Sequence, residues 1–337
     1  MGYIKMVNNQ YLKCPFPYFG GKSKIADVIW GYFGDVKKYI EPFYGSGACL
    51  LNRPQPFEGD EIVVDKDGHI CNVWRALQSD PDAVAKVCDY PINHAELSAR
   101  KKRLNKEGEG LLQKLIDDDT YYDIELAGYY IWAASCWIGA GLTRINQIPE
   151  LSTGKGIHTV GKRPHLTGSG NGIHAVGQKV DSGITSDVRE PYQITLWNWF
   201  RVLSKRLRYV RVVCGDWTRV CGGNWQDDKG NVAIFFDPPY SLEAGRDNSL
   251  YSQDSLTVAH DVRKWCIARG KLKTHRIILA GYEGEHNELE NLGWFKHEWT
   301  AGGGYSTLRK TGDNENRKKE RLWISPHCIF KSQVKLF

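Results

Sequence analysis

At 337 residues, the chain is long enough to bury a large core and to carry one domain with a sizeable insertion. Its formal net charge of +6 favours a polyanionic partner. Nine cysteines, scattered from Cys14 to Cys328 with no CxxC pair, argue against a disulfide framework or a zinc site and favour a reducing cytoplasm.

The amino-terminal segment shows no apolar core or cleavage signal, which argues against secretion. Residues 15–23 then form a glycine-containing turn that looks at first like a phosphate loop. The GxxxxGK[ST] pattern, however, needs a glycine where Phe16 stands. Two interpretations remain: a tight turn before a helix, or a turn that presents Tyr18 and Lys22 to the amino-acid end of a ligand.

A second glycine loop follows the first predicted strand, at residues 39–41. Gly45 and Gly47 allow the backbone to turn sharply and to approach a ligand closely. The third glycine of the dinucleotide fingerprint GxGxxG is missing, which weakens a hydride-transfer interpretation. The next predicted strand, 61–65, ends at Asp65, where a carboxylate can accept hydrogen bonds from ribose hydroxyls.

The middle of the chain departs from this pattern. Residues 94–138 predict two helices, and the uncharged stretch 126–143 indicates a buried helix rather than a membrane span. Glycine-rich residues 153–183 contain a short repeat, in which 156–161 recurs as 172–177. The repeat is either a duplicated loop or an element that contacts DNA.

Residues 193–208 predict an amphipathic helix with a basic face. Arg201, Lys205 and Arg206 lie on that face without an acid among them, which favours contact with nucleic acid over a merely solvated surface. The basic cluster 100–103 is a second candidate for gripping phosphates.

The apolar run 232–236 leads directly into an acid, two prolines and a tyrosine. The prolines carry no N–H, so their neighbouring carbonyls stay free as acceptors. We predict that the Asp237 carboxylate and the Pro238 carbonyl grip an exocyclic amino group, with Tyr240 stacking on the same flat base. Preorganised acceptors of this kind stabilise the charge that develops on the amino nitrogen.

Further strands are predicted at 210–213 and 276–280, with helical patterns between several of the strands. This alternation predicts an α/β fold with a doubly wound, mostly parallel, Rossmann-like sheet. Ligands bind beyond the carboxyl ends of such strands, so the acids and glycines named above are expected to face one crevice.

Taken in order, the motifs resemble those of the Dam-like DNA adenine-N6 methyltransferases of the D12 class, in the α arrangement. The resemblance rests on residues 18–22, 41–47, Asp65, 215–217 and 237–240, and 320–324 look like that family's closing strand.

The resemblance implies S-adenosylmethionine as cofactor and assigns roles around it. Tyr18 and Lys22 contact its methionine part. The remaining expected contacts wrap the cofactor, hold its ribose, face its adenine or adjoin its methyl group: Phe43, Gly45, Gly47, Asp65, Asp216, Trp217 and Asp237. For Asp216, a turn or helix-cap acid is the alternative interpretation. No metal is expected.

The resemblance also implies double-stranded DNA as partner and a flipped-out target base. Residues 141–146 are similar to the segment that opens the family's target-recognition region, which makes Arg144 and Asn146 candidate DNA contacts. Ala140 replaces the usual first asparagine of that segment. The target sequence is not carried over, because 153–183 do not resemble the family's recognition hairpin.

The expected organisation is a catalytic domain at 1–92 and 207–337, interrupted by a target-recognition insertion at 93–206. We expect a monomer or weak dimer on DNA, in a bacterial or phage-infected cell, with or without a paired restriction enzyme. Competing interpretations are a cytosine-N4 methyltransferase, a DNA-binding protein without catalysis, a nicotinamide oxidoreductase and a small-molecule methyltransferase.

Overall fold

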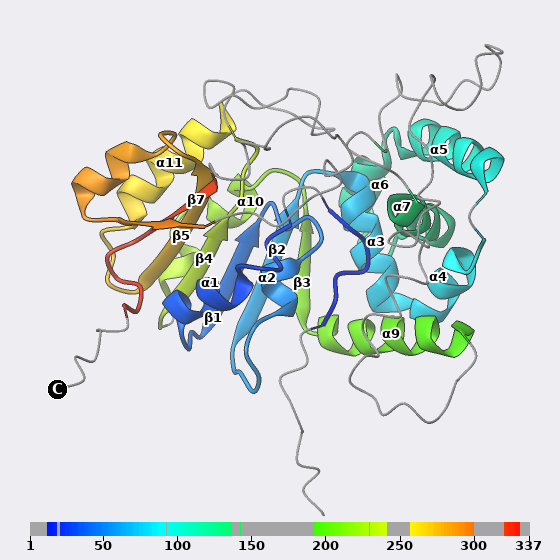
Figure 1. Ribbon diagram of the computed structural model, residues 1–337, viewed down its shortest axis with the longest axis horizontal. Helices are drawn as coiled ribbons and strands as arrows, with labels where there is room; N and C mark the ends of the chain where they lie inside the picture. The colour runs from blue at the N-terminus through cyan, green and yellow to red at the C-terminus, as the bar shows by residue number, and fades with distance from the viewer. Residues whose placement is uncertain are drawn as a thin grey trace, which may run out of the picture.

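The computed structural model describes residues 12–18, 21–91, 93–136, 142, 192–228, 230–240, 257–299 and 320–330. Within these ranges, seven strands form a single sheet in the order β3-β2-β1-β4-β5-β7-β6 (Figure 1). The strands are β1 (Lys38–Pro42), β2 (Asp60–Asp65), β3 (Val210–Cys214), β4 (Val232–Phe236), β5 (His275–Tyr282), β6 (Phe295–Glu298) and β7 (Glu320–Ile324).

The sheet is mostly parallel. Strands β3, β2, β1, β4 and β5 pair in parallel, whereas β7 runs antiparallel to both β5 and β6. From β1 the chain first builds outward through β2 to β3 and then continues on the other side through β4 and β5. The junction between β1 and β4 is therefore the switch point beyond which ligands bind in open α/β sheets. The predicted fold class and six predicted strands are confirmed, and β6 is an addition.

Helices surround the sheet and extend beyond one of its edges. Their bounds are α1 (Ala26–Phe33), α2 (Ala48–Leu51), α3 (Gly68–Ser79), α4 (Pro81–Cys88), α5 (His94–Gly108), α6 (Leu111–Asp117), α7 (Ile124–Cys136), α9 (Tyr192–Leu207), α10 (Thr218–Cys221) and α11 (Val258–Arg269), with short 3-10 turns η2 (Trp225–Asp228) and η3 (Asn287–Leu292). Helices α3 to α7 and α9 gather beyond the β3 edge (Figure 1).

The parallel strands are apolar on both sides because both faces of the sheet are covered. Successive residues point to opposite faces, so Tyr39 and Phe235 pack into the core that contains α1, whereas Ile40 and Phe236 pack into the core that contains α10 and α11. Residues of β1 and β4 are buried, and in β4 this burial explains the unbroken apolar run from Val232 to Phe236. The carboxyl ends of these strands therefore rest on a rigid support.

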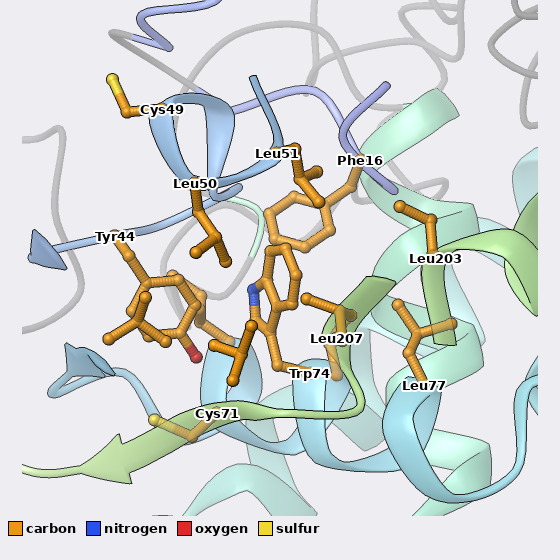
Figure 2. Close-up of a cluster of buried hydrophobic side chains, with 14 of the residues drawn as sticks. Phe16, Tyr44, Cys49, Leu50, Leu51, Cys71, Trp74, Leu77, Leu203 and Leu207 are labelled. Atoms are coloured by element: carbon orange, nitrogen blue, oxygen red, sulfur yellow. The ribbon is translucent and has the colours of Figure 1, made fainter. Parts of the chain in front are cut away.

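Trp74 on α3 joins the sheet to the helices beyond its edge. Its indole lies between Leu50 near the β1 loop and Leu207 on α9 (Figure 2), and its side chain is fully buried. The indole nitrogen donates a hydrogen bond of 3.0 Å to the carbonyl of Gly45. The packing of α3 thereby reaches into the glycine loop predicted to bind a ligand.

The helices before residue 92 and those after it share one core. Helix α7 packs against α3, α4 and α5, and α9 packs against α3 and α4. Asn72 on α3 also exchanges two hydrogen bonds with the backbone of Asp123, at 2.7 and 2.8 Å. Helices on the two sides of these boundaries thus pack against one another. The domain boundaries at 92/93 and 206/207 stay a prediction.

The expectation of two helices in residues 94–138 is wrong, because the structure has three: α5, the short α6 and α7. Gly110 begins α6 in a left-handed conformation and breaks what the sequence suggests is one long helix. The helix predicted at 193–208 is confirmed as α9. In the part of the chain that the structure describes, no helix has the length and apolarity needed to cross a membrane.

Candidate active site

The candidate site is built around the chain that leaves β4. Asp237 is the first residue beyond this buried strand, and Pro238 and Tyr240 behind it are buried. The Tyr240 hydroxyl donates a hydrogen bond of 3.1 Å to Oδ1 of Asp237. The Tyr240 ring contacts the ring of Tyr282, at the end of β5, edge to face at 4.5 Å between centroids. The carboxylate is thus held in a defined orientation at the carboxyl edge of the sheet.

Lys22 reaches the same carboxylate from the turn before α1. Its Nζ donates hydrogen bonds to Oδ2 of Asp237 at 2.8 Å and to the Tyr240 hydroxyl at 3.1 Å. Its side chain is only 3% exposed, and a second acid, Glu320, lies 3.6 Å away. The sequence predicts that Lys22 contacts the amino-acid end of a ligand. In the structure, Lys22 is hydrogen-bonded directly to Asp237, which is predicted to bind the exocyclic amino group. That prediction missed Glu320 and Tyr282, whose positions depend on strand pairing.

The loop after β1 turns through an unusual run of left-handed residues. Phe43, Gly45 and Gly47 have φ angles of 61°, 49° and 68°. A Cβ atom on Gly45 would lie 2.6 Å from the Tyr18 ring, and one on Gly47 would lie 2.6 Å from the Trp74 ring. Both glycines are therefore required by packing as well as by backbone conformation. The loop lies beside the switch point between β1 and β4.

Asp65, at the carboxyl end of β2, ties this loop to the neighbouring strand. Its Oδ2 accepts a hydrogen bond of 3.1 Å from the Gly45 amide, and its Oδ1 accepts one of 2.9 Å from the Asp67 amide. Burial, and then the nearby Asp67 charge, raise the pKa of Asp65 to about 7. Each oxygen keeps a second lone pair, so the carboxylate can still accept hydrogen bonds from a ligand's hydroxyl groups.

Asp216 and Trp217 follow β3 at the same edge of the sheet. The Gly215 amide donates 2.8 Å to the Asp65 carbonyl, which brings this segment next to the β2 end. Asp216 accepts hydrogen bonds from the backbone and hydroxyl of Thr218, at 3.0 and 2.7 Å, as a turn acid before α10 does. The Trp217 ring packs edge to face on Phe236. Their roles at a ligand stay predictions, and the local contacts show what holds them in place.

Two kinds of comparison bear on these residues. Residues 18–159 match the model of the D12 class N6 adenine-specific DNA methyltransferase family. Over these residues the chain is therefore similar to that family. The match includes the turn with Tyr18 and Lys22, the glycine loop and Asp65, whereas Asp237 lies beyond the matched range.

The chain is also similar to two characterised proteins at low identity. It is 23% identical over 231 residues to the DNA N-6-adenine-methyltransferase of Escherichia phage P1, covering 67% of this chain and 24% of that protein. It is 24% identical over 235 residues to the type II methyltransferase M.MjaIII of Methanocaldococcus jannaschii, covering 66% of each. The chain therefore spans about a quarter of the first relative's length and just under two thirds of the second's.

The basic residues that were predicted to contact DNA are less available than the sequence suggests. On α9, Arg201 and Lys205 are both exposed, but Arg201 is paired with Asp82 at 2.8 Å. The largely buried Arg206 donates to both oxygens of Glu61, at 2.6 and 2.7 Å. Glu61 lies near the amino end of β2, away from the carboxyl edge that bears Asp65. The predicted contacts Arg144 and Asn146, and the repeat in 153–183, lie outside the described residues.

The cluster 100–103 also differs from the expected phosphate-gripping surface. Arg100 is buried, with its guanidinium over the rings of Tyr90, Tyr129 and Trp132, at 4.4 to 4.6 Å from their centroids. Lys101 is fully buried and donates 2.6 Å to the carbonyl of Leu142. Lys102 is exposed, and the half-exposed Arg103 pairs with Glu107 and Glu125, so the four residues do not form the continuous basic surface that was expected.

We predict that Arg206→Ala lowers the free energy of unfolding by roughly 2 kcal/mol, because the buried Glu61 loses two charged hydrogen bonds and keeps Arg53, at 3.3 Å, as a charged partner. Urea denaturation measures this loss, and Lys205→Ala, which removes an exposed neighbouring charge, is the control expected to leave stability nearly unchanged. If Arg206→Ala instead kept its stability and reduced the salt dependence of DNA binding, Arg206 would be a phosphate contact.

Proposed function

We propose that this chain transfers the methyl group of S-adenosylmethionine to the N6 amino group of adenine in double-stranded DNA. The observation that carries the proposal is the position of Asp237 directly across the β1–β4 switch point from the glycine loop. One side of the junction offers acceptors for an amino group, and the other offers a turn suited to a nucleoside-containing ligand. The name of the phage P1 relative supports methyl transfer to adenine N6 of DNA, and the name of the second relative supports methyl transfer.

The residues present fit S-adenosylmethionine by their chemistry. The Asp65 carboxylate suits the ribose hydroxyls, and the left-handed turn at Gly45 and Gly47 lets the backbone approach the cofactor closely. We place Tyr18, Phe43, Asp216 and Trp217 around the rest of the cofactor, as the resemblance implies. When bound, the cofactor supplies an electrophilic methyl group on a sulfonium. No group of three or more His, Cys, Asp or Glu residues within the described ranges could hold a metal ion.

The residues after β4 make the adenine nitrogen reactive. Its lone pair is delocalised into the ring, so the free amino group is a poor nucleophile. Asp237 and the Pro238 carbonyl accept hydrogen bonds from the two N–H groups and favour a tetrahedral nitrogen. Both oxygens of Asp237 already accept a hydrogen bond, yet each keeps a lone pair for the base.

The transfer is a single in-line displacement. With the donor bound, the amino nitrogen held by Asp237 and Pro238 would attack the methyl carbon, and the electron pair of the broken C–S bond would remain on sulfur. The methylated nitrogen then loses a proton, with Asp237 as the nearest acceptor. The base reaches this site only when it is flipped out of the duplex, with Tyr240 as the stacking surface. Positioning supplies much of the acceleration.

DNA contacts belong to the same proposal. Lys205 and Arg201 are both exposed on α9, although Arg201 also forms an ion pair with Asp82. We propose both as phosphate contacts together with Arg144 and Asn146. The protein acts on DNA inside a bacterial or phage-infected cell.

Analysis of the methylated product tests which base the protein modifies. Purified protein, duplex DNA and labelled S-adenosylmethionine should give N6-methyladenine after digestion to nucleosides. N4-methylcytosine as the sole product would establish the alternative activity.

The pKa of Asp65 predicts a pH-dependent cofactor affinity. The pKa is raised from its ordinary value to about 7, so the carboxyl is mostly protonated at pH 6 and mostly ionised at pH 8. The ribose hydroxyls need the ionised form, and S-adenosylhomocysteine should therefore bind roughly tenfold tighter at pH 8 than at pH 6. Calorimetric titration measures this. Asp65→Asn should bind weakly with little pH dependence, and an unchanged profile in that variant would place the ribose elsewhere.

A further inference from the structure

Two acids surround a single lysine in the candidate site. Lys22 lies 2.8 Å from Oδ2 of Asp237 and 3.6 Å from Oε2 of Glu320, and both Lys22 and Glu320 are buried. With both acids ionised, the three side chains therefore carry one more negative charge than positive charge. An uncompensated charge in a buried place is costly, so the arrangement is suited to a cationic ligand.

The pairing of β7 explains how Glu320 reaches this place. The parallel strands bring their last residues to the carboxyl edge, whereas an antiparallel strand brings its first residue there. Glu320 is the first residue of β7 and pairs with Tyr282, the last residue of β5. The ring of Tyr282 in turn contacts Tyr240. Glu320 is thus part of the sheet itself and is held next to residues 237–240.

Glu320 also has unused capacity to accept. Among the described residues, its buried Oε2 has an ion pair with Lys22 but no hydrogen-bond partner. Burial and the neighbouring Asp237 raise the pKa of Glu320, and Lys22 opposes that rise. The lysine is therefore the group that opposes protonation of this acid, and a small movement of its Nζ would bring it into hydrogen-bonding range of Glu320.

We propose that Glu320 is a positioning residue that balances the positive charge of the methyl donor's sulfonium. It gives the Lys22 ammonium a second carboxylate while Asp237 accepts a hydrogen bond from the target amino group. With the donor bound, two positive charges, on Lys22 and sulfur, face two negative charges, on Asp237 and Glu320. The inference rests on the proposed function, because it takes the sulfonium of S-adenosylmethionine as the cation.

The charge balance predicts how the site distinguishes its cofactor from the product. S-adenosylhomocysteine lacks the methyl group and the positive charge but keeps the rest of the molecule. Removing the charge of Glu320 should weaken S-adenosylmethionine on the order of tenfold at the effective dielectric of a protein site. The affinity for S-adenosylhomocysteine should change less than about twofold, because a neutral sulfur does not sense the missing charge. A merely structural loss would weaken both ligands together.

Calorimetric titration of both ligands into Glu320→Gln, Lys22→Met and the double variant tests the proposal. Glu320→Gln should lower the preference for S-adenosylmethionine, and Lys22→Met should raise it, because two acids then face the sulfonium. The double variant should return the preference to the wild-type value. Glu298→Gln, which removes an exposed acid from β6 opposite Arg321, is the matched control and should change neither affinity.

A preference that stays at the wild-type value in both Glu320→Gln and Lys22→Met overturns the proposal. If Glu320→Gln alone does not fold, the comparison of Lys22→Met with the double variant decides the matter, since equal preferences in the two would leave Glu320 without this role. Failure of the proposed function is seen separately. It shows as wild-type protein that puts no methyl group on adenine, whatever the binding preferences are.

Discussion

Asp237→Ala is expected to slow methyl transfer to DNA by at least about a thousandfold, because it removes a preorganised acceptor at the reacting nitrogen. Asp237 supplies the carboxylate at the end of β4, where Lys22 and Tyr240 hold it by hydrogen bonds. The variant should still fold, since Lys22 keeps its ion pair with Glu320. Single-turnover transfer of labelled methyl groups to duplex DNA measures the rate.

The same variant should still bind the cofactor measurably, since the glycine loop and Asp65 are untouched by the change. Asp261→Ala is a suitable control, because Asp261 is an exposed acid on α11 that pairs loosely with Lys264 at 3.6 Å. Near-normal turnover by Asp237→Ala would remove Asp237 from the reaction. Loss of cofactor binding along with turnover would place its role on the donor side instead.

Gly47→Ala is expected to lower the free energy of unfolding by about 3 kcal/mol or more, since overpacking adds to backbone strain. Gly47 precedes α2 with φ of 68°, and an added Cβ would lie 2.6 Å from the Trp74 ring. That indole is fully buried and holds the Gly45 carbonyl by a hydrogen bond. Relief of the clash would move the loop, so cofactor affinity should fall as well.

The chain offers a matched control for this substitution. Gly110 precedes α6 in the same left-handed conformation, with φ of 75°, and an added Cβ there meets no atom within 4 Å. Gly110→Ala should therefore cost only about 1 kcal/mol, from backbone strain alone. Urea denaturation of both variants separates the two contributions. Equal losses would show that the Trp74 contact adds nothing to the requirement for glycine.

The parts of the fold that could be predicted are those with a strong local signal. Strand β4 is buried on both faces and reads as a continuous apolar run. Strand β6 was missed because its residues, Phe295 to Glu298, are only partly buried and do not alternate. The short α6 was missed because residues 94–117 have no proline to interrupt the helical pattern, and only Gly108 and Gly110 mark the break.

The sequence was sufficient to identify the motifs of the site, but it did not show which of their residues contact one another. The glycine loop and the segment after β4 are contiguous motifs, and their chemistry can be read from the sequence. The link from Lys22 to Glu320 spans nearly the whole chain and depends on the antiparallel pairing of β7. Charge counting also overstated the basic surface, because it could not show that Lys101 is buried or that Arg206 is paired with Glu61.

The measurement that tests the central claim most directly is sequencing of DNA for modified bases, from methylation-deficient cells expressing the wild-type chain or Asp237→Ala. We predict N6-methyladenine at one defined sequence with the wild-type chain and none above background with the variant. Absence of N6-methyladenine with well-folded wild-type protein, or equal methylation with the variant, would contradict the account.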